Sequence, residues 1–203
     1  MRKRPTQTRS KRVVDNLLEA TGHVIAERGL DQTTTNHIAK RAGVSVGSLY
    51  QYFADKNELV EALMVQLSRE MIMAVNARLV DLMQQDTEAV VRGLLTAALM
   101  AMEQKPRLYL ELTRSWPRRR SLAGMDALEE HMMEACRRYI LRHHQRLKVE
   151  NLPAALFVII NATLFTVMRH LSLDNPAISR EELVDALSAM VAAYLEGSAN
   201  QTA

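Results

Sequence analysis

The sequence is poor in residues that cross-link a chain or turn it sharply. Its 203 residues include 7 glycines, 5 prolines and one cysteine, and aromatic side chains make up only 4%. The abundant residues are Ala, Leu, Met, Glu and Arg, which favour helices. The composition therefore predicts an all-α protein.

Two further absences bear on the cellular setting. The lone Cys136 cannot form an intrachain disulfide, and the N-terminus lacks the apolar run of a secretory signal. We therefore expect a reducing, cytoplasmic environment. One apolar stretch, residues 152–171, approaches membrane-spanning length but contains a proline, an arginine and a histidine. We interpret it as a buried helix and expect no membrane partner.

Positive charge is concentrated near the N-terminus. Residues 1–60 hold ten Lys or Arg against six acids, whereas the other 143 residues hold sixteen against seventeen. A basic N-terminal part attracts phosphates and speeds encounter with nucleic acid. The first nine residues are also polar and contain a proline, so we expect a flexible basic arm over residues 1–9.

Apolar residues recur at helical spacing along the rest of the chain, which predicts about nine helices. The first begins near Ser10 and stops at Gly29, and the fourth ends near Leu82. Glycines and prolines separate the later segments. The remaining predicted helices cover approximately residues 33–42, 46–52, 86–103, 106–114, 122–147, 152–171 and 180–196.

The segment from Thr33 to Lys56 has the pattern of a helix-turn-helix. Thr33 or Thr34 can cap a helix that ends at Gly43. Ser45 can then cap a second helix, which begins at Val46. In this motif the second helix enters the major groove, so its outer side chains should be small or polar and its inner ones apolar. Residues 46–52 fit that requirement. The alternative is a compact three-helix subdomain whose tyrosines only pack.

The same segment closely resembles the TetR family of bacterial transcriptional repressors, over about residues 8–60. The matching elements are Thr8-Arg9, Glu27-Arg28-Gly29, Thr34-Thr35, Ile38-Ala39, Ala42-Gly43-Val44-Ser45, Gly47-Ser48-Leu49-Tyr50-Gln51-Tyr52-Phe53 and Lys56. The resemblance implies a helix-turn-helix DNA-binding domain over residues 10–55. It also implies a larger helical domain for ligand binding and dimerisation over residues 56–203.

Candidate DNA contacts follow from the motif and the resemblance together. Gly47 allows close approach, Ser48 can reach a base or a phosphate, and the tyrosine hydroxyls and Lys56 can meet phosphates. Arg9 belongs to the basic arm. We expect the arm to contact phosphates or the minor groove, and the alternative is that it is only a solubilising tail. The full predicted set is Thr35, Asn36, Val46, Gly47, Ser48, Tyr50, Gln51, Tyr52, Lys56 and Arg9.

The segment 152–171 is apolar nearly all the way round its helical circumference, so it needs cover on more than one side. One face can pack on its own domain and the other on a second copy. A twofold dimer would also present two recognition helices to a pseudo-palindrome. The resemblance implies that the last two helices form this interface. The predicted interface residues are Leu156, Ile159, Ala162, Thr163, Leu187, Met190 and Tyr194.

Methionines are numerous between the fourth and eighth predicted helices, and methionine is frequent at promiscuous binding surfaces as well as in cores. The resemblance implies that some of this region lines a cavity for a largely apolar effector. Arg114 could mark an entrance for anionic ligands, or it could belong to a solvated loop. The candidate ligand residues are Met71, Met102, Leu112, Arg114, Trp116 and Met133.

We expect no catalytic residues, no metal site and no cofactor. The sequence has no nucleotide-binding loop, no G-x-S-x-G turn and no histidine spacing typical of a metal site. The hypothesis is a dimeric repressor that a small molecule releases from an operator. The alternatives are an activator of the same family and a non-specific architectural DNA-binding protein.

Overall fold

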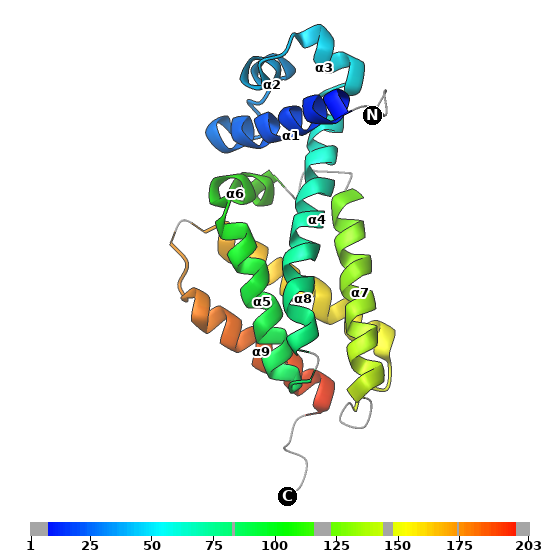
Figure 1. Cartoon of the computed structure of the whole chain (residues 1–203). Helices are drawn as coiled ribbons and strands as arrows, with labels where there is room; N and C mark the ends of the chain where they lie inside the picture. Colours follow the sequence, from blue (N-terminus) through cyan, green and yellow to red (C-terminus); the bar gives the residue numbers. More distant parts are fainter. Residues whose placement is uncertain (1–7, 83, 116–122, 144–147, 174, 198–203) are drawn as a thin grey trace, which may run out of the picture. The chain divides into compact units, whose positions relative to one another are not determined.

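The structure is a computed structural model, and it describes residues 8–82, 84–115, 123–143, 148–173 and 175–197 (Figure 1). These residues form nine α-helices and no strand, which confirms the predicted all-α fold. The helices are α1 (Thr8–Arg28), α2 (Thr35–Ala42), α3 (Val46–Tyr52), α4 (Lys56–Leu82), α5 (Thr87–Glu103), α6 (Pro106–Ser115), α7 (Ala123–His143), α8 (Leu152–Leu171) and α9 (Arg180–Glu196).

Polar side chains fix where several helices begin. Asp86 and Asn151 accept hydrogen bonds from the backbone of the first turns of α5 and α8. Ser179 and Glu182 form a reciprocal capping box at α9. The hydrogen bonds from Ser179 lower the pKa of Glu182, because they stabilise its ionised carboxylate. The predicted helix boundaries are confirmed to within a few residues because caps and prolines mark them in the sequence.

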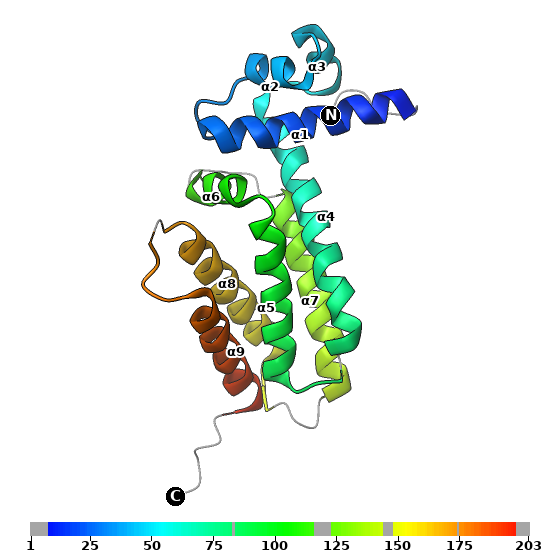
Figure 2. The same cartoon turned by 60° about the vertical axis from the view of Figure 1, so that its left-hand side comes forward.

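The helices divide into two compact units, residues 1–69 with 105–127 and residues 70–104 with 128–203. Helix α4 contributes to both. The sequence predicts a domain boundary between residues 55 and 56, whereas the first turns of α4 and all of α6 belong with the N-terminal helices. Helix α6 lies against α1 and covers part of its surface (Figure 2).

The core of the first unit draws on α1, α2, α3, α4 and α6. Leu17 and Ile25 of α1 are fully buried, as are Ile38 of α2 and Leu49 of α3. Further buried side chains of this core are Phe53, Leu59, Val60, Leu63, Leu67, Leu108 and Leu112. Burying a side chain of this size contributes about 1.5–3 kcal/mol, so this core holds the two short helices α2 and α3 rigidly in place.

The second unit is centred on α5, α8 and α9. In Figure 2, α9 lies beside α5, and the two share a buried cluster with α8. Leu95 and Leu99 of α5 meet Val167 of α8 in this cluster. The α9 members are Leu183, Val184 and Leu187.

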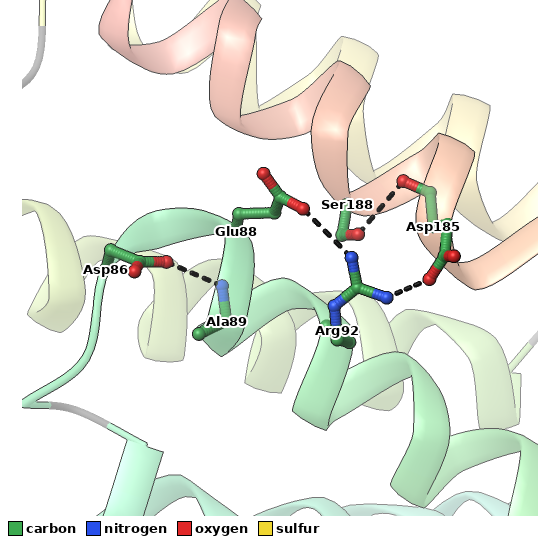
Figure 3. Close-up of polar contacts among 6 residues, drawn as sticks. All are labelled: Asp86, Glu88, Ala89, Arg92, Asp185 and Ser188. Carbon is green, nitrogen blue, oxygen red and sulfur yellow. Dashed lines mark hydrogen bonds and ion pairs between the residues drawn. The ribbon is translucent and has the colours of Figure 1, made fainter. Parts of the chain in front are cut away.

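Polar contacts reinforce the packing of α5 in the second unit. Arg92 of α5 bridges Glu88 on its own helix, at 2.9 Å, and Asp185 of α9 (Figure 3). The buried hydroxyl of Thr87 donates to the Glu196 carboxylate at the end of α9. The first two turns of α5 are thus tied to α9 at Asp185 and at its last residue, Glu196.

Helix α8 is long and apolar enough to cross a membrane, with a mean hydropathy of 1.7, and only 28% of that stretch is buried within the protein. No other helix in the described part of the chain meets this test. One face of α8 packs against α5 and α9, as expected. Its other face is exposed, so the expectation of a buried helix holds for one side only.

Candidate nucleic-acid interface

Helices α2 and α3 are joined by a three-residue turn whose geometry depends on one glycine. Thr34 caps α2 by accepting a hydrogen bond from the His37 amide at 3.2 Å. Gly43 has φ 67°, a left-handed conformation that side chains with a Cβ rarely adopt. This conformation lets the Val44 amide reach back to the Ala39 carbonyl at 3.0 Å and end the helix.

The second helix of the motif begins directly after the turn. Ser45 caps α3 by accepting a hydrogen bond from the Ser48 amide at 3.0 Å. Its hydroxyl donates to the Ser48 hydroxyl oxygen, also at 3.0 Å. Ser48 therefore keeps its own hydroxyl proton for an outside acceptor. The predicted cap at Ser45 is confirmed.

The two helices present different faces to the core and to solvent. Ile38 and Leu49 are buried, while Asn36 and Gln51 are exposed. Val46 is half-buried and packs against the first unit's core. Val46 therefore supports the motif from within, although it is one of the predicted DNA contacts.

Gly47 lies on the exposed side of α3, and the protein's own packing does not require a glycine there. A Cβ built at this position would meet only the Ser45 hydroxyl oxygen, at 3.9 Å, within ordinary contact distance. Gly47 also has no positive φ. Glycine in a helix costs about 0.5–1 kcal/mol relative to alanine. Glycine at position 47 thus lowers the stability of the helix, and the packing of the fold does not explain why a glycine is there.

Two hydroxyls meet at the outer edge of the motif. Thr35, the first residue of α2, lies 3.2 Å from Tyr50 of α3, measured from Oγ1 to the phenol oxygen. The contact is exposed, and 42% of Tyr50 is accessible. Both residues belong to the predicted set of DNA contacts. The structure brings them together, so that one anionic oxygen can accept from both.

Tyr52 differs from the prediction. The sequence suggested that it points away from the core, but it is only 9% exposed and belongs to the buried cluster of the first unit. Its hydroxyl accepts a hydrogen bond from Ser10 of α1 at 3.2 Å. Because α3 has only seven residues, its last turn must pack to hold the helix. Tyr52 therefore connects the start of α1 to the end of α3.

Lys56, at the start of α4, also has a partner within the protein. Its ammonium donates to the carbonyl oxygen of Leu30 at 3.2 Å. This bond ties α4 to the connection between α1 and α2. An ammonium group has three donors, so Lys56 can still reach a phosphate.

The electrostatics of this unit are consistent with an anionic partner. Lys11, Arg12 and Lys40 are exposed, whereas Arg41 pairs with Glu27 at 2.6 Å. Arg9 lies in α1, so the helix begins at Thr8, before the expected end of the arm at residue 9. Residues 1–7 of the predicted arm lie outside the described residues.

The predicted ligand residues are not all in one unit. Leu112 is buried in the first unit's core, and Arg114 is near Glu111 of the same helix, at 3.7 Å. In the second unit, Met71 is buried and Met102 packs against the α5–α8–α9 cluster. Met133 is half-buried there. Trp116 lies outside the described residues. Leu112 thus has a packing role that the sequence could not separate from ligand binding.

The predicted dimer residues fall on both sides of α8 and α9. Leu156, Ile159 and Leu187 are buried inside their own unit, so for these three the prediction selected the wrong face. Ala162 and Thr163 are half-buried. Met190 and Tyr194 are exposed in the single chain, so they are free to contact a second copy.

The exposed apolar residues of α8 are not among the predicted interface residues. Phe157, Val158 and Phe165 are 59%, 50% and 68% exposed. Their spacing of one, seven and eight residues places them on one side of a helix. That spacing was visible in the sequence, but a helix that is apolar all round does not reveal which side its own domain covers.

No group of three or more potential metal ligands occurs among the described residues. Burial raises the pKa of Cys136 to about 11, so its thiol stays protonated and unreactive at neutral pH.

Comparison with known proteins finds a family whose sequence profile matches part of the first unit. Residues 17–63 match the sequence profile described as "Bacterial regulatory proteins, tetR family". The HTH-type transcriptional regulator BetI of Cronobacter sakazakii is 47% identical over 73 residues, which are 36% of either chain. The nucleoid occlusion factor SlmA of Glaesserella parasuis is 30% identical over 106 residues, 52% of this chain and 50% of that protein. The chain thus matches half or less of the length of these relatives.

The fold similarity extends further than the sequence similarity. SmeT, the repressor of the Stenotrophomonas maltophilia multidrug efflux pump SmeDEF, superimposes with a TM-score of 0.69 over 93% of both chains, at 18% identity. At this identity the likeness concerns the fold. The matched family and relatives are named as regulators or as a nucleoid occlusion factor, in agreement with the prediction that the chain is not an enzyme.

Proposed function

We propose that this chain, a member of the TetR family, is a transcriptional regulator that binds a pseudo-palindromic operator as a homodimer and is released by a small molecule. The observation that carries the proposal is the outer face of α2 and α3. Exposed hydrogen-bonding groups and a bare backbone at Gly47 occupy this face, while Ile38 and Leu49 anchor both helices from beneath.

The proposed contacts divide into those that hold the backbone and those that read bases. Thr35 and Tyr50 form a joint phosphate contact, because their hydroxyls already lie 3.2 Å apart. Lys56 adds a charge. Gln51 and Ser48 reach base edges in the major groove, where amide and hydroxyl groups can discriminate between base pairs. Gly47 allows α3 to approach closely enough for these short side chains to reach.

The proposed dimer explains the exposed apolar residues of the second unit. We define the apolar face as Phe157, Val158 and Phe165 of α8 with Met190 and Tyr194 of α9. An aromatic side chain carries roughly 150–250 Å² of surface, so these five leave on the order of 500 Å² exposed. A specific dimer buries about 800 Å² per partner, and this face supplies most of that area.

A second copy also meets the geometric requirement of the DNA. A single seven-residue recognition helix reads few base pairs, whereas a twofold dimer presents two such helices about 34–36 Å apart to successive major grooves. A monomer by sedimentation equilibrium at micromolar concentration would contradict this part of the proposal.

Control by a small molecule requires two arrangements of the dimer with different affinities for that molecule. The half-buried Met102 and Met133 make the second unit adaptable to an apolar ligand. SmeT, which shares the fold, is a repressor, and this favours repression over activation. In an activator of the same family, the ligand would strengthen operator binding instead.

A footprint on the DNA upstream of the chain's own gene tests the core of the proposal. We expect one protected pseudo-palindrome, with binding at least a thousandfold tighter than to unrelated DNA of the same length, a ratio of about 10³ being the lower limit for specific regulators. Equal affinity for both DNAs would instead support the architectural alternative. Thermal-shift screening of apolar compounds then tests ligand binding, since a ligand of the folded state must stabilise it.

A further inference from the structure

The exposed side of α8 contains one polar residue within its apolar stretch. Between Ala154 and Phe165, the exposed residues are apolar except for Asn161. Asn161 is the tenth of the twenty residues of α8, so it stands at the midpoint of the helix. Asparagine is a weak helix former, and neither helix propensity nor the internal packing of the unit explains its place there.

The spacing around Asn161 is typical of a helix that packs against another helix. Ala154, Val158, Asn161, Phe165 and Met168 follow one another at intervals of four, three, four and three residues. This is the repeat of a coiled-coil seam, in which such residues face a partner helix. All but the half-buried Met168 are exposed in the single chain.

The hydrogen bonds of Asn161 leave a specific pair of groups unused. Its side-chain amide donates one hydrogen to the Phe157 carbonyl of its own helix, at 2.9 Å. The carboxamide has a second N–H and an acceptor oxygen. Covering the apolar face would bury both groups, and an unsatisfied buried polar group costs about 1–3 kcal/mol.

A twofold dimer offers one arrangement that satisfies these groups without any other residue. When two α8 helices cross antiparallel at their midpoints, each Asn161 faces its own counterpart. Each carboxamide then donates its second N–H to the other's oxygen, and every polar group of the pair is bonded. Any displacement along the helix would bury the two carboxamides unpaired.

We propose that Asn161 lies on the twofold axis of the dimer, pairs with Asn161 of the second copy and thereby fixes the alignment of the two α8 helices. The inference rests on the proposed homodimer and adds the residue that determines its register. A buried asparagine in a helical seam has this effect elsewhere, where it selects one register and one oligomeric state at a cost in stability.

Disulfide cross-linking tests the position directly. A disulfide requires Cα atoms within about 7 Å, which only residues near the axis achieve with their own counterparts. We expect Asn161→Cys to form a covalent dimer on treatment with diamide. Ala154→Cys is the matched control, since it lies on the same seam seven residues away. At 1.5 Å per residue its two copies would be roughly 21 Å apart and would not cross-link.

The wild-type chain completes the comparison, because its one cysteine is the half-buried Cys136 and it should stay uncross-linked. Sedimentation of the same samples separates the two levels of the proposal. If the wild-type chain sediments as a monomer, the proposed dimer is wrong. If it sediments as a dimer but Asn161→Cys fails to cross-link, or Ala154→Cys cross-links equally, only the role of Asn161 is wrong.

A second variant measures the energetic cost of the carboxamide. Asn161→Val preserves a compact side chain and removes the polar groups, so we expect its dimer dissociation constant to fall by roughly tenfold. An unchanged dissociation constant would show that Asn161 remains exposed in the dimer and would overturn the inference.

Discussion

Replacing Gly47 by alanine should strengthen the fold and weaken DNA binding, two effects of opposite sign from one methyl group. The structure gives the reason for the first effect. The new Cβ would lie 3.9 Å from the Ser45 hydroxyl oxygen and would meet no other side chain closely. Since alanine is favoured over glycine in a helix by about 0.5–1 kcal/mol, we expect the free energy of unfolding to rise by a similar amount.

The effect on DNA follows from the exposed position of Gly47. A methyl group on the outer face of α3 holds the helix away from the groove and weakens the short contacts of Ser48 and Gln51. A good base contact contributes about 1–3 kcal/mol, so the operator dissociation constant should rise by roughly 5- to 150-fold. Fluorescence anisotropy with a labelled operator measures this change, and urea unfolding measures the stability.

Gly43→Ala provides the matched control within the same motif. No atom lies within 4 Å of a Cβ built at Gly43, but its φ of 67° makes any side chain strained there. This variant should therefore lose about 1 kcal/mol of stability where Gly47→Ala gains it. The reasoning about Gly47 fails if its alanine variant is destabilised, or if it binds the operator with full affinity.

Three other outcomes follow from the structure. Lys56→Met should lower the slope of log affinity against log salt by about one and also weaken the fold, because the Leu30 carbonyl loses one of its two donors and keeps only the Thr33 amide; an unchanged slope would show that Lys56 only supports the loop. Gly93→Ala should destabilise by about 1–3 kcal/mol in urea unfolding, since its Cβ would approach Leu82 Cδ1 to 2.6 Å; wild-type stability would mean that the Leu82 side chain moves aside freely. At pH 8 the Cys136 thiol, with its pKa raised to about 11, should react with a thiol reagent roughly 100-fold more slowly in the native chain than in denaturant, and equal rates would contradict its burial.

The helices and the helix-turn-helix motif could be predicted from local sequence alone. Caps and stops such as Thr34, Gly43 and Ser45 are local, and a hydrogen bond to a neighbour three residues away needs no tertiary contact. For the same reason the order and the approximate ends of all nine described helices could be predicted, and the inward residues Ile38 and Leu49 followed from helical spacing.

Which positions stay exposed depends on tertiary packing. Tyr52 fits the pattern of a DNA contact, yet it is buried at the end of the short α3, and its hydroxyl oxygen accepts a hydrogen bond from Ser10, 42 residues away. Thr35 and Tyr50 were predicted separately and prove to be neighbours. Contacts of this kind depend on the path of the intervening chain, and the spacing of apolar residues in the sequence does not reveal that path.

Helix α8 shows most clearly what local sequence determines and what packing determines. Its sequence is apolar on all sides and therefore predicts that it needs cover, but an all-round pattern cannot indicate direction. Packing against α5 and α9 buries Leu156 and Ile159 and leaves Phe157, Phe165 and Asn161 outside. Local sequence thus determines that a helix forms and where it ends. Its neighbours in space decide which side remains for a partner, because burial is a property of the packed molecule.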